Sequence, residues 1–83
     1  MEQNAENYDL VYEYLLRKYN RITIGKKEMA AELGIGLSTL DLYMKKGIGI
    51  PSYLKLGNKR NSRILFNITD VAEFLSSNKI KTL

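Results

Sequence analysis

Hydrophobic side chains recur three and four positions apart near the start of the chain. This spacing predicts a helix over about residues 7–20 with one buried face. Asn7 is expected to cap the first turn of this helix, and Asn20 is expected to end it. The predicted buried stripe consists of Tyr8, Val11, Tyr12, Leu15, Leu16 and Tyr19.

Glycines divide the segment that follows. Residues 22–24 are β-prone and predict a short strand. Gly25 can serve as the N-cap of a second helix over Lys26–Leu33. Gly34 is expected to end this helix, because glycine adopts the left-handed backbone conformation with the least strain.

A third helix is predicted to begin at Leu37 or Ser38 and to end at Gly47. Residues 48–51 then form a turn, since Pro51 can continue neither a helix nor a central strand.

A β-hairpin is predicted next. Residues 53–56 and 63–66 are strand-like, and residues 57–62 between them have the composition of a hairpin turn. Because side chains of a strand alternate between two faces, Ile64 and Phe66 point together, and this pair is the one expected in the core.

The last helix is expected to begin at Asn67, with Asn67 and Asp70 as a capping pair, and to fray after Asn78. Its predicted buried residues are Val71, Phe74 and Leu75. The chain therefore predicts a single domain over residues 1–83, mainly α with a small β-hairpin, in which residues 78–83 are a frayed tail.

Composition argues against several classes of protein. The chain is 45% hydrophobic and 27% charged, which is ordinary for a folded soluble domain. No apolar run approaches the roughly 18 residues of a membrane span, and the N-terminus is too acidic and polar for a signal peptide. We therefore expect a cytoplasmic protein that binds no membrane. With no cysteine and no histidine, we expect no enzymatic activity, no metal site and no cofactor.

Positive charge is concentrated in one segment. Residues 1–20 carry four acidic and two basic side chains, a net charge of −2, whereas residues 45–63 carry six basic side chains and no acidic one. The chain has a pI of about 9.4. A localised positive charge of this kind is typical of a polyanion binder, and the alternative is a solvated basic loop.

The segment just before this basic stretch has the composition of a helix-turn-helix. Two helices that cross over a tight turn need a small residue at their closest approach and a residue that tolerates positive φ in the turn. Ala30 and Gly34 meet these needs. The apolar residues expected to fill the angle between the helices are Met29, Leu33, Ile35, Leu40 and Tyr43. A generic helical hairpin is the alternative interpretation.

Several of these segments resemble small bacterial DNA-binding proteins. The first part resembles the bacterial helix-turn-helix signature and the recognition helix of MerR-like regulators. The later part resembles excisionase-type and AlpA-type proteins of phages and integrative elements. The residues that carry the resemblance are Ala30–Ile35, Ser38–Tyr43, Lys46–Ile48, Pro51, Leu56–Arg60, Arg63–Phe66 and Thr69–Leu75.

The resemblance implies a winged helix-turn-helix over residues 22–77 with an extra N-terminal helix over residues 7–20. It also implies sequence-specific binding of double-stranded DNA by a nucleoid-associated protein of a bacterium, phage or mobile element. Two roles remain open: an excisionase-like recombination directionality factor and a small transcriptional regulator. MerR-like regulators usually carry Arg where this chain has Asp41, and no coiled coil or effector segment follows Leu83, so we expect no small-molecule effector.

Candidate DNA contacts fall into three groups. The expected recognition-helix residues are Leu37, Ser38, Thr39, Asp41, Leu42, Lys45 and Lys46. The expected wing residues are Lys55, Lys59, Arg60 and Arg63, and Lys26 and Lys27 at a helix N-terminus are expected to contact the DNA backbone. The hydroxyl groups of Ser38 and Thr39 can bond to phosphates or base edges. Asp41 can accept a hydrogen bond from cytosine N4, and Leu42 can contact a thymine methyl group. The alternative for Leu37 is that it caps the hydrophobic core of the turn, and the alternative for Leu42 is that it packs on the N-terminal helix.

Two other classes of function stay open, namely an RNA-binding domain and a protein–protein interaction module. A single-strand RNA binder usually displays stacking aromatics on a sheet, whereas most tyrosines here lie in the N-terminal stripe. Leu10 and Tyr14 lie four residues apart and off that stripe, which suggests a self-association patch. A stable dimer and a monomer that cooperates on DNA are both compatible with the sequence.

Overall fold

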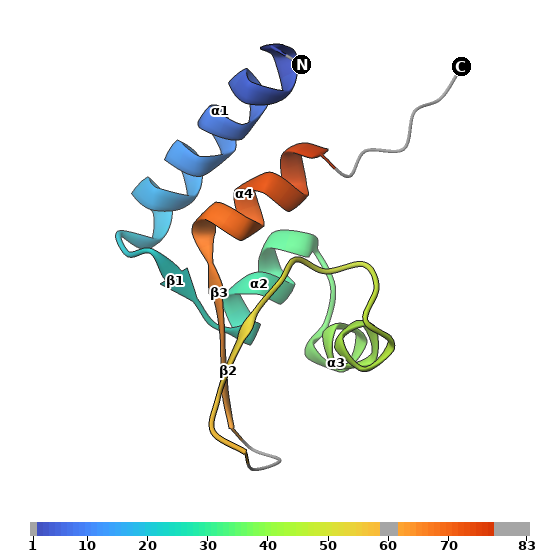
Figure 1. Cartoon of the computed structure of the whole chain (residues 1–83). Coiled ribbons are helices and arrows are strands. Elements are labelled where there is room, and N and C mark those ends of the chain that lie inside the picture. The colour runs from blue at the N-terminus through green and yellow to red at the C-terminus, as the bar shows by residue number, and fades with distance from the viewer. Residues whose placement is uncertain (1, 59–61, 78–83) are drawn as a thin grey trace, which may run out of the picture.

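The computed structural model describes residues 2–58 and 62–77, and Figure 1 shows their arrangement. Helices and strands follow one another in the predicted order. Their bounds are α1 Glu2–Tyr19, β1 Thr23–Ile24, α2 Lys26–Leu33, α3 Leu37–Lys46, β2 Leu54–Leu56, β3 Arg63–Asn67 and α4 Ile68–Ser77. The protein is therefore mainly helical, with a small antiparallel sheet, as the sequence predicts.

The first helix is longer than predicted. It begins at Glu2, so Asn7 lies inside α1 and does not cap it. The prediction was wrong here because the apolar periodicity starts only at Tyr8, whereas the Glu, Gln and Ala residues before it favour a helix by intrinsic propensity alone. Its end is as predicted: Asn20 has a φ of 54°, and its N–H donates to the carbonyl of Leu16 at 2.8 Å.

The ends of α2 and α3 follow the glycines. Gly25 precedes α2, and its N–H donates to the Glu28 carboxylate at 2.8 Å. Gly34 and Gly47 close α2 and α3 with φ values of 71° and 74°, in the left-handed region that favours glycine. A short turn over residues 34–36 therefore connects the two helices.

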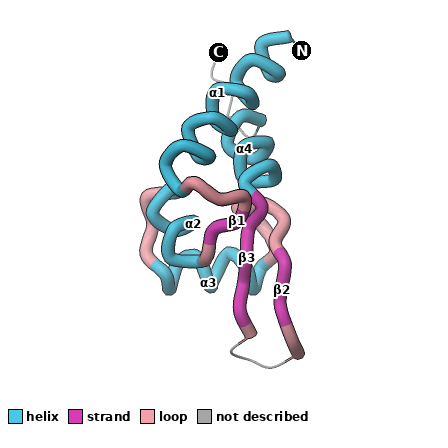
Figure 2. Tube along the Cα trace, turned by 90° about the vertical axis from the view of Figure 1, so that its left-hand side faces the viewer, coloured by secondary structure: helices cyan, strands magenta, loops and turns pink. Residues whose placement is uncertain are grey.

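The sheet has the strand order β1-β3-β2, so β3 is its central strand. Ile24 of β1 pairs with Phe66, and Lys55 of β2 pairs with Ile64. The β2–β3 hairpin projects away from the helices (Figures 1 and 2). The predicted hairpin turn includes Lys59 and Arg60, which lie outside the described residues.

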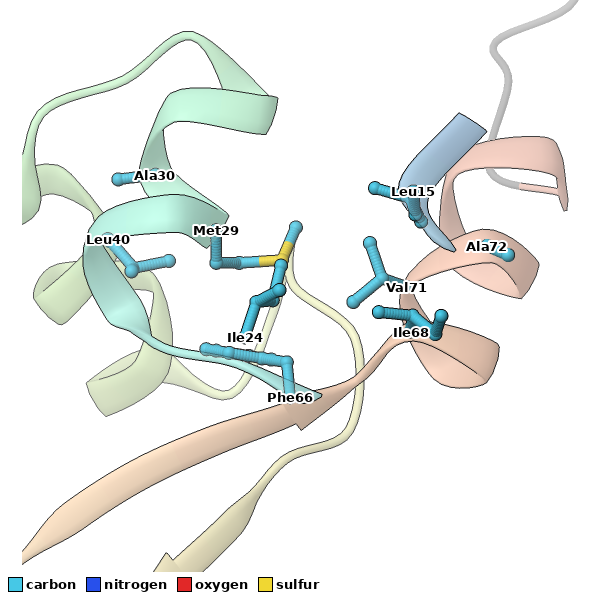
Figure 3. Close-up of a cluster of buried hydrophobic side chains, with 9 residues drawn as sticks. All are labelled: Leu15, Ile24, Met29, Ala30, Leu40, Phe66, Ile68, Val71 and Ala72. Carbon is cyan, nitrogen blue, oxygen red and sulfur yellow. The ribbon is translucent and has the colours of Figure 1, made fainter. Parts of the chain in front are cut away.

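One core joins all the helices to the sheet (Figure 3). Its buried members are Leu15, Ile24, Met29, Ala30, Leu40, Phe66, Ile68, Val71 and Ala72. The other five members of the predicted α1 stripe are partly buried and pack against this cluster, which confirms the stripe. In this arrangement α1 lies mainly along α4 (Figure 1).

The last helix starts one residue later than predicted. Asn67 is the last residue of β3 and pairs with Thr23, so α4 begins at Ile68. No hydrogen bond joins Asn67 and Asp70 among the described residues, so the predicted capping pair does not form. Val71 is buried as expected, but Phe74 and Leu75 are only half-buried. The buried face is made by Ile68, Val71, Ala72 and Ser76.

Candidate nucleic-acid interface

The α2–α3 pair buries one side of α3 and leaves the other accessible. Leu40 of α3 is buried, and Met44 packs against the core. Of the five residues predicted to fill the angle between α2 and α3, Met29 and Leu40 are fully buried, and the other three are half-buried. Met29, Leu33, Ile35 and Leu40 thus belong to the core or pack against it, whereas the ring of Tyr43 lies beside Gly49.

The outward side of α3 carries the residues predicted to face outward. Its exposed members are Leu37, Ser38, Asp41, Leu42, Lys45 and Lys46. Leu37 and Leu42 are 47% and 46% exposed, and neither belongs to the core cluster or packs against it. Thr39 is half-buried and is less accessible than expected.

A groove with a volume of about 1120 Å³ lies between the N-terminus of α2, one side of α3 and the β2–β3 hairpin. Its lining includes basic residues from all three elements, which lie far apart in the sequence. They are Lys26, Lys27, Lys45, Lys55 and Arg63. Two carboxylates, those of Glu28 and Asp41, also line it, so the described lining has an excess of three positive charges over negative ones.

Both carboxylates of the groove are paired. Glu28 accepts from the N–H of Gly25 at 2.8 Å and from Arg21 at 3.0 Å. These interactions, the Gly25 N–H above all, lower the pKa of Glu28. The Asp41 carboxylate forms an ion pair with Lys26, which the sequence did not reveal. Lys26 is thus engaged within the protein rather than simply available to a phosphate.

The other basic residues of the groove stay unpaired. No ion pair is found for Lys27, Lys45, Lys55 or Arg63 among residues 2–58 and 62–77. Lys27, Lys45, Lys55 and Arg63 are all exposed. Their charges therefore face solvent and can be satisfied by an external polyanion.

The hairpin contributes both charge and apolar surface. Lys55 lies opposite Ile64 in the register, on the face of the sheet that also carries Phe66. Ile64 and Phe66 belong to the core or pack against it, as predicted. The other face bears Leu54 and Leu56, which are about half exposed.

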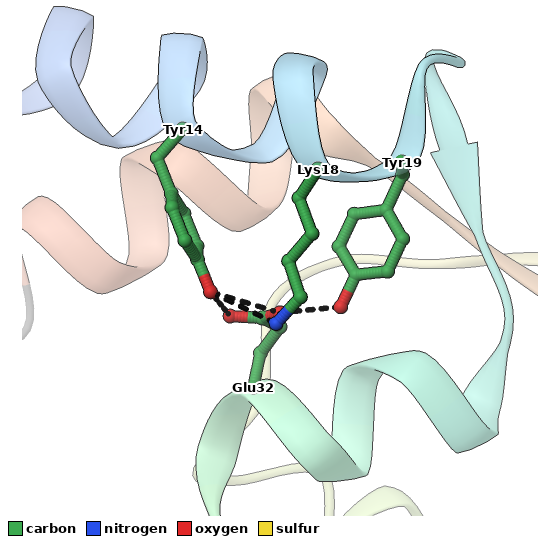
Figure 4. Close-up of polar contacts among 4 residues, drawn as sticks. All are labelled: Tyr14, Lys18, Tyr19 and Glu32. Atoms are coloured by element: carbon green, nitrogen blue, oxygen red, sulfur yellow. Dashed lines mark hydrogen bonds and ion pairs between the residues drawn. The ribbon is translucent and has the colours of Figure 1, made fainter.

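A polar cluster that the sequence did not predict joins α1 to α2 (Figure 4). The Glu32 carboxylate accepts from Lys18 at 2.8 Å, from the Tyr14 hydroxyl at 3.0 Å and from the Tyr19 hydroxyl. Tyr14 and Lys18 are four residues apart and therefore lie together on α1, off the apolar stripe. This spacing was the one feature of the sequence that could have indicated the cluster. Tyr14 was assigned to a self-association patch, but its hydroxyl is engaged within the chain.

This cluster perturbs the titration of its members. Burial and the hydrogen bond to Glu32 raise the pKa of Tyr19 to about 12. The hydrogen bonds to Glu32 and Tyr14 raise the pKa of Lys18. Burial acts to raise the pKa of Glu32, but the hydrogen bonds from Lys18, Tyr19 and Tyr14 outweigh it and lower that pKa. The cluster thus pairs the Glu32 carboxylate of α2 with the Lys18 ammonium of α1.

Comparisons with known proteins found no match: no family model, no curated protein and no solved structure is significantly similar to this chain. Within the described part of the chain, no helix is long and apolar enough to cross a membrane. The same residues contain no group of three or more acidic side chains placed to hold a metal ion.

Proposed function

We propose that this protein is a winged helix-turn-helix protein that binds double-stranded DNA in a sequence-specific manner. In this proposal α3 is the recognition helix, and the β2–β3 hairpin is the wing. The observation that carries the proposal is the groove in which α2, α3 and the hairpin bring together five basic residues. The order of the elements and the β2–β3 hairpin support the winged fold that the sequence resemblance implies.

The proposed docking follows from the accessible side of α3. The major groove of B-DNA is about 12 Å wide and admits one α-helix, which enters N-terminus first in proteins of this class. Ser38 and Leu42 are exposed on α3 and would meet base edges. Lys45, at the opposite end of that helix, would meet a phosphate.

The hairpin would lie beside the same duplex. Lys55 and Arg63 line the groove from the hairpin side. The register places their side chains on opposite faces of the hairpin, and a positive charge on the groove side suits the phosphates that flank the recognition helix. Phosphate contacts position a protein on DNA, and base contacts specify a sequence. The hairpin side of the groove would therefore position the protein, and α3 would read the sequence.

The aromatic side chains favour duplex DNA over single-stranded RNA. Tyr8, Tyr12 and Tyr19 pack against the core, and Tyr14 is bonded to Glu32. Tyr53 lies against the ring of Phe66, with 5.7 Å between the ring centroids. A row of exposed rings, on which unpaired bases could stack, is absent from the sheet that the structure describes.

Two cellular roles fit this activity, and the sequence resemblance supports both. An excisionase-like recombination directionality factor would occupy adjacent sites beside an attachment sequence. A small transcriptional regulator would occupy a site over a promoter. A footprint on the DNA that flanks the gene for this protein would distinguish the two patterns.

Selection of preferred sites from a pool of random duplexes tests the binding activity itself. We expect one enriched motif, bound more tightly than random duplex or single-stranded RNA of equal length. Equal affinity for the enriched motif, random duplex and single-stranded RNA would contradict the proposal. Tighter binding of the RNA would favour an RNA-binding domain.

A further inference from the structure

The two carboxylates that line the groove differ in their capacity for further hydrogen bonds. Both oxygens of Glu28 are occupied, Oε1 by the Gly25 N–H and Oε2 by Arg21. Asp41 uses Oδ1 for Lys26. No partner for Asp41 Oδ2 is found among the described residues. Asp41 therefore keeps an acceptor that can bond to a ligand in the groove.

The position of this acceptor is constrained from two helices. Asp41 lies in α3, and its side chain is 54% exposed, whereas Lys26 is the first residue of α2 and is 34% exposed. The ion pair thus bridges two helices whose packing is set by the core. A short carboxylate held in this way has fewer orientations than an unpaired side chain on the same helix.

A carboxylate at this place lowers the affinity for DNA unless a donor group of the DNA bonds to it. The phosphates and most base atoms in the major groove are acceptors and repel a carboxylate, whereas the amino group of cytosine donates. Adenine also has an amino group, but its N7 acceptor lies beside it. A carboxylate on the recognition surface therefore disfavours most base pairs and favours cytosine.

On the basis of the function proposed above, we infer that Asp41 is a specificity-determining residue that selects cytosine at one position of the DNA site. Lys26 is its positioning residue: it holds the carboxylate in the lining of the groove and offsets the repulsion between that carboxylate and the DNA backbone. Lys26 consequently adds little to the non-specific affinity, in contrast to its neighbour Lys27, which has no ion-pair partner among the described residues.

Site selection with the Asp41→Asn variant tests the role of Asp41. We expect wild-type protein to prefer cytosine by roughly tenfold at one position. The variant should shift that preference toward adenine, because asparagine can both donate to N7 and accept from N6. It should also bind random duplex more tightly, with a log–log salt slope steeper by about 0.9, because Lys26 becomes available to a phosphate.

Two further variants test the role of Lys26. Lys26→Met should weaken the preference for cytosine, and Lys26→Arg should restore it. Lys27→Met is the matched comparison, and it should flatten the salt slope by about 0.9 while leaving the base preference intact. Glu13→Gln is the control for Asp41→Asn, because it also removes one negative charge. The Glu13 carboxylate pairs with Arg17 on α1 at 3.8 Å, outside the groove.

The outcomes separate this inference from the proposed function. An enriched motif that is identical for wild type and for Asp41→Asn at every position would overturn the role of Asp41. A full cytosine preference in Lys26→Met would overturn the role of Lys26. Should wild-type protein enrich no motif at all, the proposed function itself would fail. Asp41→Ser, which also removes the carboxylate, replaces Asp41→Asn if that variant does not fold.

Discussion

Two lysine–carboxylate pairs of this protein lie in contrasting surroundings. Glu32 faces α1, its side chain is only 6% exposed, and it accepts hydrogen bonds from three side chains. Asp41 lines the groove, is 54% exposed and has Lys26 as its ion-pair partner. The Glu32 carboxylate is thus shielded from solvent and bonded to three donors, whereas the Asp41 carboxylate is open to solvent and stays accessible to an external ligand.

The difference has an energetic basis. A buried acceptor that loses its partners costs about 1–3 kcal/mol, because water cannot replace them. An exposed ion pair contributes about 0–1 kcal/mol, because solvent screens it. Equivalent substitutions should therefore lower the free energy of unfolding more at Glu32, beside α1, than at Asp41, in the groove.

The largest effect is expected from the core beneath α1. Leu15 is fully buried where α1 meets the rest of the core. Leu15→Ala should lower the free energy of unfolding by about 2–5 kcal/mol, because it removes buried methyl groups and leaves a cavity. Denaturant unfolding followed by circular dichroism measures this loss. A loss below about 1 kcal/mol would mean that α1 is not part of the cooperative core.

Substitution of the two carboxylates compares the two sites directly. Glu32→Gln should lower the free energy of unfolding by about 1–3 kcal/mol, since the amide satisfies fewer of the surrounding donors. Asp41→Asn should change it by less than about 1 kcal/mol. The same denaturant titration serves for both variants. Equal losses would refute the contrast between the sites.

The pH dependence of stability should also arise on the α1 side. The folded-state pKa of Glu32 is lowered from 4.5, so its contribution is present above about pH 4.5 and is lost as the pH falls further. The pKa of Tyr19 is raised from 10.0 to about 12, so its contribution is present below pH 10 and is lost between pH 10 and 12. Thermal unfolding should therefore show a smaller acid loss for Glu32→Gln and a smaller alkaline loss for Tyr19→Phe than for wild type. Parallel profiles for variant and wild type would contradict these assignments.

The smallest effect is expected on the outer surface of α1. Leu10 is 69% exposed, and the second member of its predicted patch, Tyr14, is bonded to Glu32. Leu10→Glu should change the free energy of unfolding by no more than about 0.5 kcal/mol. Sedimentation at micromolar concentration should give a monomer for both proteins. A wild-type dimer that Leu10→Glu dissociates would restore the self-association patch.

The elements that the sequence predicted well are those set by local chemistry. Gly34 and Gly47 end their helices because the left-handed backbone there is a property of the residue itself. The stripe of α1 was likewise readable, since its period depends on helix geometry alone. The start of α1 was misplaced because no apolar or capping signal marks its first turn.

The features that the sequence did not predict depend on long-range placement. Thr23 and Asn67 pair across β1 and β3, although more than 40 residues separate them. Lys26 and Asp41 were both assigned to DNA contacts, yet their ion pair follows only from the angle between α2 and α3. Glu32 gave no local signal, because its partners lie on a helix elsewhere in the chain.

The salt dependence of duplex binding tests the central claim, that the groove is a DNA-binding surface, most directly. Lys45→Gln combined with Lys55→Gln removes two groove cations, and Arg17→Glu makes the same change of net charge on α1, where the side chain is 85% exposed. The double variant should flatten the log–log salt slope by about 1.8, from about 0.9 for each lost phosphate contact. Arg17→Glu should leave the slope within error of wild type. Equal slopes for the two variants would show that DNA responds to net charge alone and would contradict the account.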